Sequence, residues 1–298
     1  MKIFLTGASG MLGAEIIRKL SEENHELMLT DLTPRLEEIT LLDVRDVSAV
    51  KKQVAGFKPD YVLHLAAETN VDLCEQDPSH AYRTNTEGTR NVVDACRDHH
   101  IPLVYISTSS VFPGDKETPY TESDQCGPVN VYAKSKWEGE LLIEKTLKEY
   151  FIIRASWMIG GWALDKKFVY KIVSQLLAGK QELRVVADKF GTPTFTRDFA
   201  NNILPLLNTG QYGIYHMGNK GTCSRHEMAE KIVAFMGLQD KVRVIPISSD
   251  DFPLPAPRPR SEMIINSKLD SLGLNHMPPW EDALQDYIET NARQANKL

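Results

Sequence analysis

Tyr132 and Lys136 stand four residues apart in a segment whose composition predicts a helix over residues 132–148. Side chains at positions i and i+4 share one helical face, which brings an ammonium group beside a phenol. A free tyrosine has a pKa of about 10, and a neighbouring positive charge stabilises the phenolate and lowers that pKa towards neutrality. Tyr132 can then protonate a carbonyl oxygen as hydride arrives, with Lys136 also holding a nicotinamide ribose. The pair also arises by chance, so its position matters.

Thr108 follows an apolar segment, residues 103–107, that reads as a strand of the same sheet. This strand delivers hydroxyl groups to the edge where the helix bearing Tyr132 begins. Thr108 is therefore the candidate that orients the substrate carbonyl. The alternative is that hydroxyls in the run from Ser107 to Ser110 bond backbone groups of a turn.

A glycine loop, Gly7-Ala8-Ser9-Gly10-Met11-Leu12-Gly13, follows the first apolar strand and opens a helix. In that context Gly7 permits a tight turn, Gly10 lets the backbone approach a diphosphate, and Gly13 lets the helix pack on the strand. The N–H groups at a helix N-terminus attract an anion, so the loop predicts a nicotinamide dinucleotide site. The predicted cofactor contacts are Gly7, Gly10, Met11, Leu12, Gly13, Asp31, Asp43, Val44, Ala66, Ala67, Tyr132 and Lys136.

Asp31, at the end of the second strand, is placed to accept hydrogen bonds from the adenosine ribose, and its charge disfavours a 2′-phosphate. Arg35 lies close enough in sequence to offset that repulsion. The choice between NADPH and NADH therefore stays open.

Apolar strands alternate with amphipathic helices through the first half of the chain. This pattern predicts an α/β fold with a doubly wound parallel sheet of the Rossmann type. The expected strands are residues 2–6, 26–30, 61–65, 103–107 and 151–154, and the expected helices are residues 11–20, 47–54, 79–97 and 132–148.

The second half is less regular, with helices expected at residues 196–207 and 225–236 and a strand at 214–217. We predict a dinucleotide-binding domain over residues 1–157, rejoined by about 194–218, and a smaller α/β domain, mainly for substrate binding, over 158–298. No hydrophobic run in this half marks a large independent core.

Composition excludes several other classes. A net charge of −6 argues against a nucleic-acid partner, and no apolar run approaches the roughly 18 residues that span a bilayer. Cysteine and histidine spacing indicates neither a redox pair nor a metal site, and no cluster of carboxylates suggests a magnesium site. We expect a cytoplasmic protein without metal, and leave open whether it forms a homodimer.

The glycine loop with Thr108, Tyr132 and Lys136 resembles the extended short-chain dehydrogenase/reductase superfamily. Further segments resemble one branch of it, the dTDP-4-dehydrorhamnose reductases, nearly end to end. They are residues 66–72, 107–108, 111–114, 130–132 with Lys136, 154–157, 190–194, 213–216, 257–259 and 266–269.

The resemblance implies that Thr108, Tyr132 and Lys136 are catalytic and that hydride passes from NADPH or NADH to C4 of a dTDP-4-keto-6-deoxy sugar. The expected pathway is dTDP-rhamnose formation for cell-surface polysaccharide. It also implies that Trp157 lies beside the sugar and that the C-terminal part grips the nucleotide diphosphate. The expected substrate contacts are Thr108, Ser109, Tyr132, Trp157, Arg258 and Arg260, the two arginines because a guanidinium matches phosphate oxygens.

One departure concerns the sugar. The family usually has Asp-Tyr after the catalytic threonine, where this chain has Ser109-Ser110. The preferred 4-keto sugar is therefore left open. Two other functions are also weighed: a nucleotide-sugar epimerase, which retains its cofactor, and a non-catalytic module that regulates a partner enzyme. The complete set of Thr108, Tyr132 and Lys136 argues against the second.

Overall fold

The computed structural model describes residues 1–164 and 167–295, within which seven parallel strands form one sheet in the order β11-β6-β5-β4-β1-β2-β3. The order reverses between β1 and β4, which is where a doubly wound sheet opens its ligand crevice. The predicted fold class is confirmed. The strands are β1 (Lys2–Thr6), β2 (Glu26–Asp31), β3 (Ile39–Leu41), β4 (Tyr61–His64), β5 (Leu103–Thr108), β6 (Tyr150–Ala155) and β11 (Gly213–His216).

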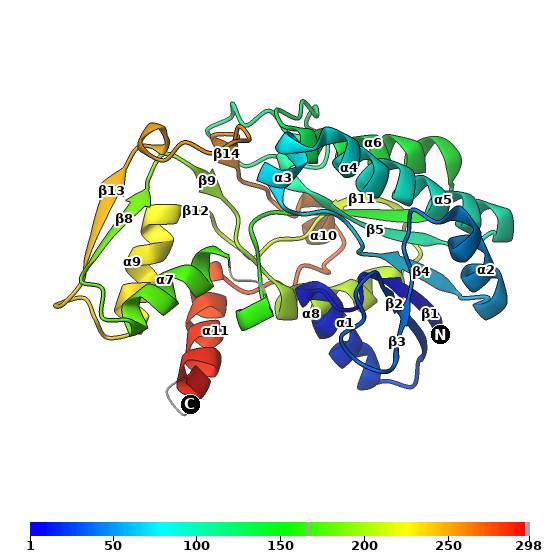
Figure 1. Ribbon diagram of the computed structural model, residues 1–298, viewed down its shortest axis with the longest axis horizontal. Coiled ribbons are helices and arrows are strands. Elements are labelled where there is room, and N and C mark those ends of the chain that lie inside the picture. The colour runs from blue at the N-terminus through cyan, green and yellow to red at the C-terminus, as the bar shows by residue number, and fades with distance from the viewer. Residues whose placement is uncertain (165–166, 296–298) are drawn as a thin grey trace.

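Helices cover both faces of this sheet (Figure 1). Ile3 and Leu5 of β1 are buried on the side of α1 and α8, whereas Phe4 is buried on the side of α2 and α5. Both faces of the strand are therefore apolar, as a covered parallel sheet requires. The covering helices are α1 (Met11–Ser21), α2 (Val47–Phe57), α5 (Gly88–His99), α6 (Val131–Thr146) and α8 (Thr196–Leu207).

The helix expected over residues 79–97 contains an irregular turn. It consists of α4 (Pro78–Tyr82), a π turn (Arg83–Glu87) and α5, and is preceded by a short helix, α3 (Val71–Gln76). A π turn inserts one residue into the helical repeat and frequently marks a functional site. Asn85 lies in this turn and is fully buried.

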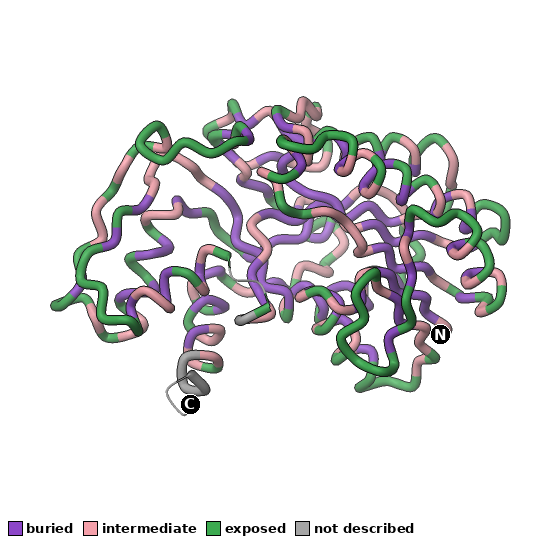
Figure 2. Tube along the Cα trace, in the orientation of Figure 1, coloured by how far each residue is buried: buried purple, intermediate pink, exposed green. Residues whose placement is uncertain are grey.

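The second half forms a separate lobe with its own hydrophobic core, which the lack of a long hydrophobic run did not indicate. The core is assembled from short elements, including Val173, Leu183, Ile232 and Leu284, and no single apolar run reveals it. Figure 2 shows this buried interior beside that of the main sheet. Residues 165–166 and 296–298 of the expected substrate domain lie outside the described part of the chain.

The lobe's strands form small sheets that pair β7 with β10, β8 with β13, and β9 with both β12 and β14. Among the described helices, none is long and apolar enough to cross a membrane. The remaining elements are β7 (Met158–Ile159), α7 (Phe168–Leu177), β8 (Glu182–Val186), β9 (Phe190–Gly191), β10 (Thr194–Phe195), β12 (Cys223–Ser224), α9 (Arg225–Phe235), β13 (Arg243–Ile247), β14 (Ser261–Glu262), α10 (Ser267–Ser271) and α11 (Trp280–Ala295).

Candidate active site

In the glycine loop between β1 and α1, backbone atoms pack so closely around Gly7 and Gly13 that a side chain at either position would clash. Gly7 has a φ of +74°, and a Cβ there would lie 2.8 Å from the Ala66 nitrogen. A Cβ on Gly13 would lie 2.5 Å from the Gly7 oxygen. Gly10 caps α1 without a side-chain hydrogen bond, which leaves N–H groups of the first turn for an anion. The loop therefore fits a dinucleotide diphosphate.

Asp31 ends β2 beside this loop. Its carboxylate accepts hydrogen bonds from the backbone N–H of Ser9 at 2.9 Å and of Thr33 at 2.8 Å. The backbone N–H of Arg35 donates to the Ser9 hydroxyl at 3.2 Å. These contacts fix the acidic side chain at the point where an adenosine ribose would bind.

One large cleft, of about 2000 Å³, runs from the glycine loop to the second lobe. Single-ligand pockets usually measure 300 to 1000 Å³, so this cleft has room for two large ligands. Most of the residues predicted to bind cofactor or substrate line it. They are Gly7, Gly10, Met11, Leu12, Gly13, Asp31, Asp43, Val44, Ala66, Ala67, Thr108, Tyr132, Lys136, Trp157 and Arg258.

Two predicted substrate contacts, Ser109 and Arg260, lie away from the cleft lining. Ser109 begins a short 3-10 turn after β5 and is buried, whereas the next residue, Ser110, lines the cleft. Arg260 is exposed and pairs with Glu117 on the surface at 3.6 Å. The turn rotates consecutive side chains in different directions, which sequence spacing did not reveal.

Thr108, at the end of β5, and Tyr132, in the first turn of α6, both line the cleft at the carboxyl edge of the sheet. The backbone N–H of Ser110 donates to the Thr108 hydroxyl oxygen at 3.1 Å. Asn130 caps the helix that carries Tyr132, because its side chain accepts from the Ala133 N–H at 2.9 Å. The cap and the turn together fix both hydroxyl groups.

The protonation of Tyr132 and Lys136 differs from the expectation. Burial raises the pKa of Tyr132 above its usual value, and the Glu262 and Glu68 carboxylates add to the effect, while the nearby Thr108 hydroxyl opposes it. Burial lowers the pKa of Lys136 to about 7, against the attraction of Glu140. The expected lowering of the Tyr132 pKa by Lys136 was therefore wrong, because desolvation dominates the pKa of both groups.

A buried ion pair lies between α6, the helix that carries Tyr132 and Lys136, and the strand β6. Arg154 of β6 donates to both carboxylate oxygens of Glu140, including a contact of 2.6 Å, and the Ser107 hydroxyl also bonds Glu140. Glu140 lies one turn beyond Lys136 on α6. The pair ties this helix to the strands below it.

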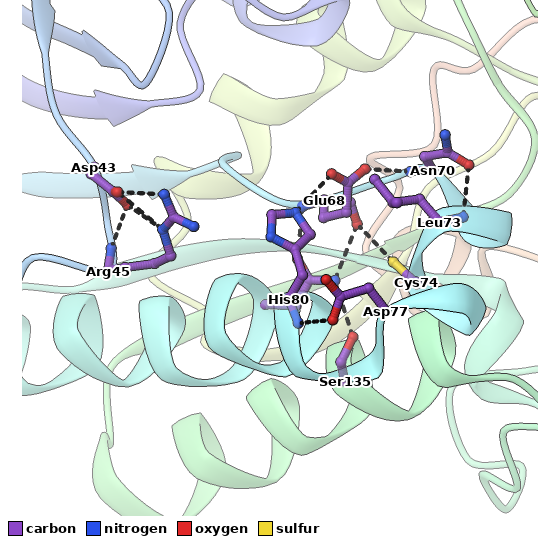
Figure 3. Close-up of polar contacts among 10 residues, drawn as sticks. Asp43, Arg45, Glu68, Asn70, Leu73, Cys74, Asp77, His80 and Ser135 are labelled. Atoms are coloured by element: carbon purple, nitrogen blue, oxygen red, sulfur yellow. Dashed lines mark hydrogen bonds and ion pairs between the residues drawn. The ribbon is translucent and has the colours of Figure 1, made fainter.

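The segment after β4 is held by Asn85, whose partners Glu68 and Ser135 are labelled in Figure 3. The side-chain oxygen of Asn85 accepts a hydrogen bond from the Glu68 backbone N–H at 2.8 Å. The side-chain NH2 of Asn85 donates to the Glu68 backbone carbonyl at 3.1 Å and to the Ser135 hydroxyl at 3.0 Å. The Glu68 carboxylate, which lines the cleft, lies 3.1 Å from His80 Nε2. Asn85 thus links the cleft wall to the helix that carries Tyr132.

At the other side of the cleft, Glu262 of β14 faces the end of β5. Its carboxylate accepts hydrogen bonds from the Ser110 hydroxyl at 2.5 Å and the Trp157 indole N–H at 2.9 Å. The Arg225 guanidinium lies 3.6 Å from the centroid of the Trp157 ring. Neither Glu262 nor Arg225 was predicted from the sequence, because no local motif distinguishes either residue.

Arg258 lines the cleft but already has partners. It donates to the Asp72 carboxylate at 2.9 Å and to the Ala256 carbonyl at 2.8 Å. Asp72 belongs to α3, beside the main sheet, so this ion pair connects the loop that contains Arg258 to α3. Among the described residues, no group of three His, Cys, Asp or Glu side chains is arranged to hold a metal ion.

A doubly wound sheet whose cleft joins a glycine loop to a Thr, Tyr and Lys set defines a Rossmann-type oxidoreductase site of the extended short-chain class. The family model of the RmlD substrate binding domain matches residues 1–293. The chain is also 32% identical over 289 residues to a dTDP-4-dehydrorhamnose reductase of Mycolicibacterium smegmatis, covering 96% of this chain and 85% of that protein.

Solved structures agree. The chain superposes on a dTDP-4-dehydrorhamnose reductase of Clostridium acetobutylicum with a TM-score of 0.90, at 35% identity, covering 98% and 100% of the two chains. The reductase of Bacillus anthracis, in complex with NADP, gives a TM-score of 0.88 at 34% identity, covering 97% and 99%. This chain belongs to the dTDP-4-dehydrorhamnose reductase family.

Proposed function

We propose that this protein reduces the C4 ketone of a dTDP-4-keto-6-deoxy sugar, converting dTDP-4-dehydrorhamnose to dTDP-L-rhamnose. Its homologues carry that activity in their names, and one of them was solved with NADP. The observation that carries the proposal is that Thr108 and Tyr132 line the same cleft as the buried Lys136 and the glycine loop. Bound NADPH or NADH would supply the hydride.

Tyr132 is the proton donor in this proposal. The raised pKa keeps its phenol protonated at neutral pH, which suits a group that must give a proton to the carbonyl oxygen during reduction. An epimerase would first need Tyr132 as a base, and the raised pKa opposes that role. We assign the Thr108 hydroxyl, which lines the same cleft, to orienting the same oxygen.

Lys136 has an electrostatic and positioning role. It is almost fully buried, so an ammonium there acts in a poorly solvated site where its charge is weakly screened. We assign it to the nicotinamide ribose and to stabilisation of negative charge that develops on the substrate oxygen.

We further propose that residues 1–157 with about 194–218 hold the cofactor and that most of residues 158–298 hold the nucleotide sugar. The return of β11 to the main sheet supports the first part of this division. Arg225, Lys189 and Arg258 are among the cationic residues of the second part that line the cleft, where a diphosphate would bind. Arg258 already pairs with Asp72, so a diphosphate would have to share this arginine with that carboxylate.

The test follows the absorbance of reduced nicotinamide during incubation with dTDP-4-dehydrorhamnose. We expect net oxidation of the cofactor and a product that co-elutes with dTDP-L-rhamnose. Tyr132→Phe should lower kcat by about 10²- to 10⁴-fold with a small change in KM, the usual contribution of a general acid. Lys134→Ala, at an exposed position on the same helix, is the matched control and should keep the wild-type rate.

Equal rates for wild type and Tyr132→Phe would reject the mechanism. Tightly retained cofactor with no net oxidation would instead favour an epimerase. No turnover on any keto sugar, together with copurification of a larger enzyme, would favour a regulatory module.

A further inference from the structure

Glu262 brings a negative charge from β14 to the corner of the cleft where β5 ends. Its side chain lines the cleft, and its charge adds to the rise in the pKa of Tyr132 that burial mainly causes. The distance in sequence is large, because Ser110 and Glu262 are 152 residues apart. The two segments meet only through the packing of the lobes.

The carboxylate is fixed by donors that leave its charge in place. The Ser110 hydroxyl donates to Oε1 at 2.5 Å and the Trp157 indole N–H donates to Oε2 at 2.9 Å. Both donors are neutral. The Ser156 hydroxyl also donates to the Glu262 carbonyl at 2.7 Å, which fixes the backbone of β14. The orientation of the side chain is therefore set before any ligand binds.

The carboxylate has unused acceptor capacity. An ionised carboxylate offers about four lone-pair sites, and Ser110 and Trp157 take one on each oxygen. What remains suits a ligand that carries hydroxyl donors, because a hydrogen bond from a hydroxyl to a carboxylate is charge-assisted and strong. A sugar ring is such a ligand, whereas a phosphate would be repelled.

Trp157 serves mainly to hold Glu262. The indole N–H is used by the carboxylate, and the ring packs against the Arg225 guanidinium and against Gly191, where a Cβ would lie 2.3 Å from the ring. Glu262, rather than the indole N–H, is therefore the polar group presented to a ligand at this corner.

We infer that Glu262 is a specificity-determining residue that accepts a hydrogen bond from a ring hydroxyl of the sugar, next to the oxygen that Tyr132 protonates. This inference rests on the proposed function for the identity of the nucleotide sugar. It assigns recognition of the sugar to β14 of the second lobe. It also gives Ser110 a defined part, which is to orient the carboxylate.

The test is a binding cycle that needs no turnover. Calorimetry with saturating oxidised cofactor compares dTDP, dTDP-L-rhamnose, and the dTDP-rhamnose analogues that lack the C2 or the C3 hydroxyl. For wild type, removal of one of these hydroxyls should weaken binding by about 10- to 100-fold, the value of a hydrogen bond to a charged group. Glu262→Ala and Glu262→Gln should abolish or reduce that difference while leaving the affinity for dTDP within about twofold.

Controls separate recognition from structure. Glu22→Gln removes an exposed carboxylate from the far end of α1 and should change nothing. Ser110→Ala leaves the charge and should weaken sugar binding by less than Glu262→Ala. A purely structural role for Glu262, through Trp157, would weaken every sugar nucleotide equally and keep the hydroxyl dependence, which would overturn the inference.

Turnover measured in parallel keeps the two proposals distinct. Hydroxyl-dependent binding that Glu262→Ala removes, without net reduction of any keto sugar by wild type, would support the role of Glu262 and reject the reductase. Reduction by wild type, with unchanged hydroxyl dependence of binding in Glu262→Ala, would support the reductase and reject the role of Glu262. Wild-type affinity for dTDP-L-rhamnose no greater than for dTDP would also overturn the inference on Glu262.

Discussion

The Lys136 ammonium nitrogen lies 3.9 Å from the centroid of the Tyr105 ring. Lys136 follows Tyr132 by one turn of α6. Tyr105 is fully buried on β5, and its hydroxyl donates to the Lys136 carbonyl at 3.3 Å. An aromatic face attracts a cation but replaces little of the hydration that burial removes. The contact therefore holds the lysine ammonium group against β5, while burial lowers the pKa of Lys136 to about 7.

Activity should consequently fall as pH rises through about 7. Lys136 is protonated below its pKa and neutral above it, so a step that needs the ammonium loses rate in the alkaline direction. We expect kcat/KM for the reduced cofactor, which reports the free enzyme, to fall up to tenfold per pH unit above that point. Lys136→Arg, which stays charged, should lack this alkaline limb. A flat wild-type profile from pH 6 to 9 would contradict the assignment.

The same pKa predicts a trend in stability. The folded state loses the Lys136 proton near pH 7, whereas the unfolded chain keeps it to about 10.4. The lysine therefore costs most stability below pH 7, and the cost shrinks as pH rises through this interval. In urea unfolding without cofactor, the advantage of Lys136→Met over wild type should decrease from pH 7 to pH 10. An advantage that grows with pH would show the opposite sign.

Asp31 should make the enzyme prefer NADH. Its carboxylate is fixed by the Ser9 and Thr33 N–H groups, and a 2′-phosphate brought to it would meet a like charge. We expect kcat/KM for NADH to exceed that for NADPH by about tenfold or more, and Asp31→Ser to reduce or reverse this ratio. Arg35→Ala tests the opposing cation and should further weaken use of NADPH. Equal use of both cofactors by wild type and Asp31→Ser would refute the assignment.

Asn85→Ala should destabilise the fold by about 1 to 3 kcal/mol, because it leaves buried polar groups of Glu68 and Ser135 without partners. Chemical unfolding measures the loss. Asn91→Ala, on the neighbouring helix α5, removes a single hydrogen bond to the Val44 carbonyl and is the matched control. A loss no greater than that of Asn91→Ala would mean that water replaces the Asn85 contacts.

Glu140→Ala should cost about 3 to 5 kcal/mol of unfolding free energy, because the buried Arg154 would lose its counterion. The double variant Glu140→Leu with Arg154→Met should be more stable than the single variant, since it leaves no uncompensated charge. Asp98→Ala, which breaks an exposed ion pair with Lys51, provides the comparison and should have a much smaller effect. Similar losses at the buried and exposed pairs would show that Arg154 finds another partner.

Local sequence determined the features whose physics is local. The alternation of apolar strands and amphipathic helices predicted the sheet, because the spacing of apolar residues along each segment indicates its secondary structure and its buried face. The glycine loop was predictable because only glycine tolerates the close backbone contacts at Gly7 and Gly13. Tyr132 and Lys136 were predictable as neighbours because they are separated by about one helical turn.

Only the tertiary structure decided the electrostatics and the sugar side of the cleft. The pKa directions of Tyr132 and Lys136 depend on burial by several elements, which a pair of residues on one helix does not reveal. The approach of Glu262 to Ser110 depends on how the lobes pack, as does the pairing of Arg258 with Asp72. Sequence patterns record which residues are buried, whereas contacts between distant segments are set by the packing of whole elements.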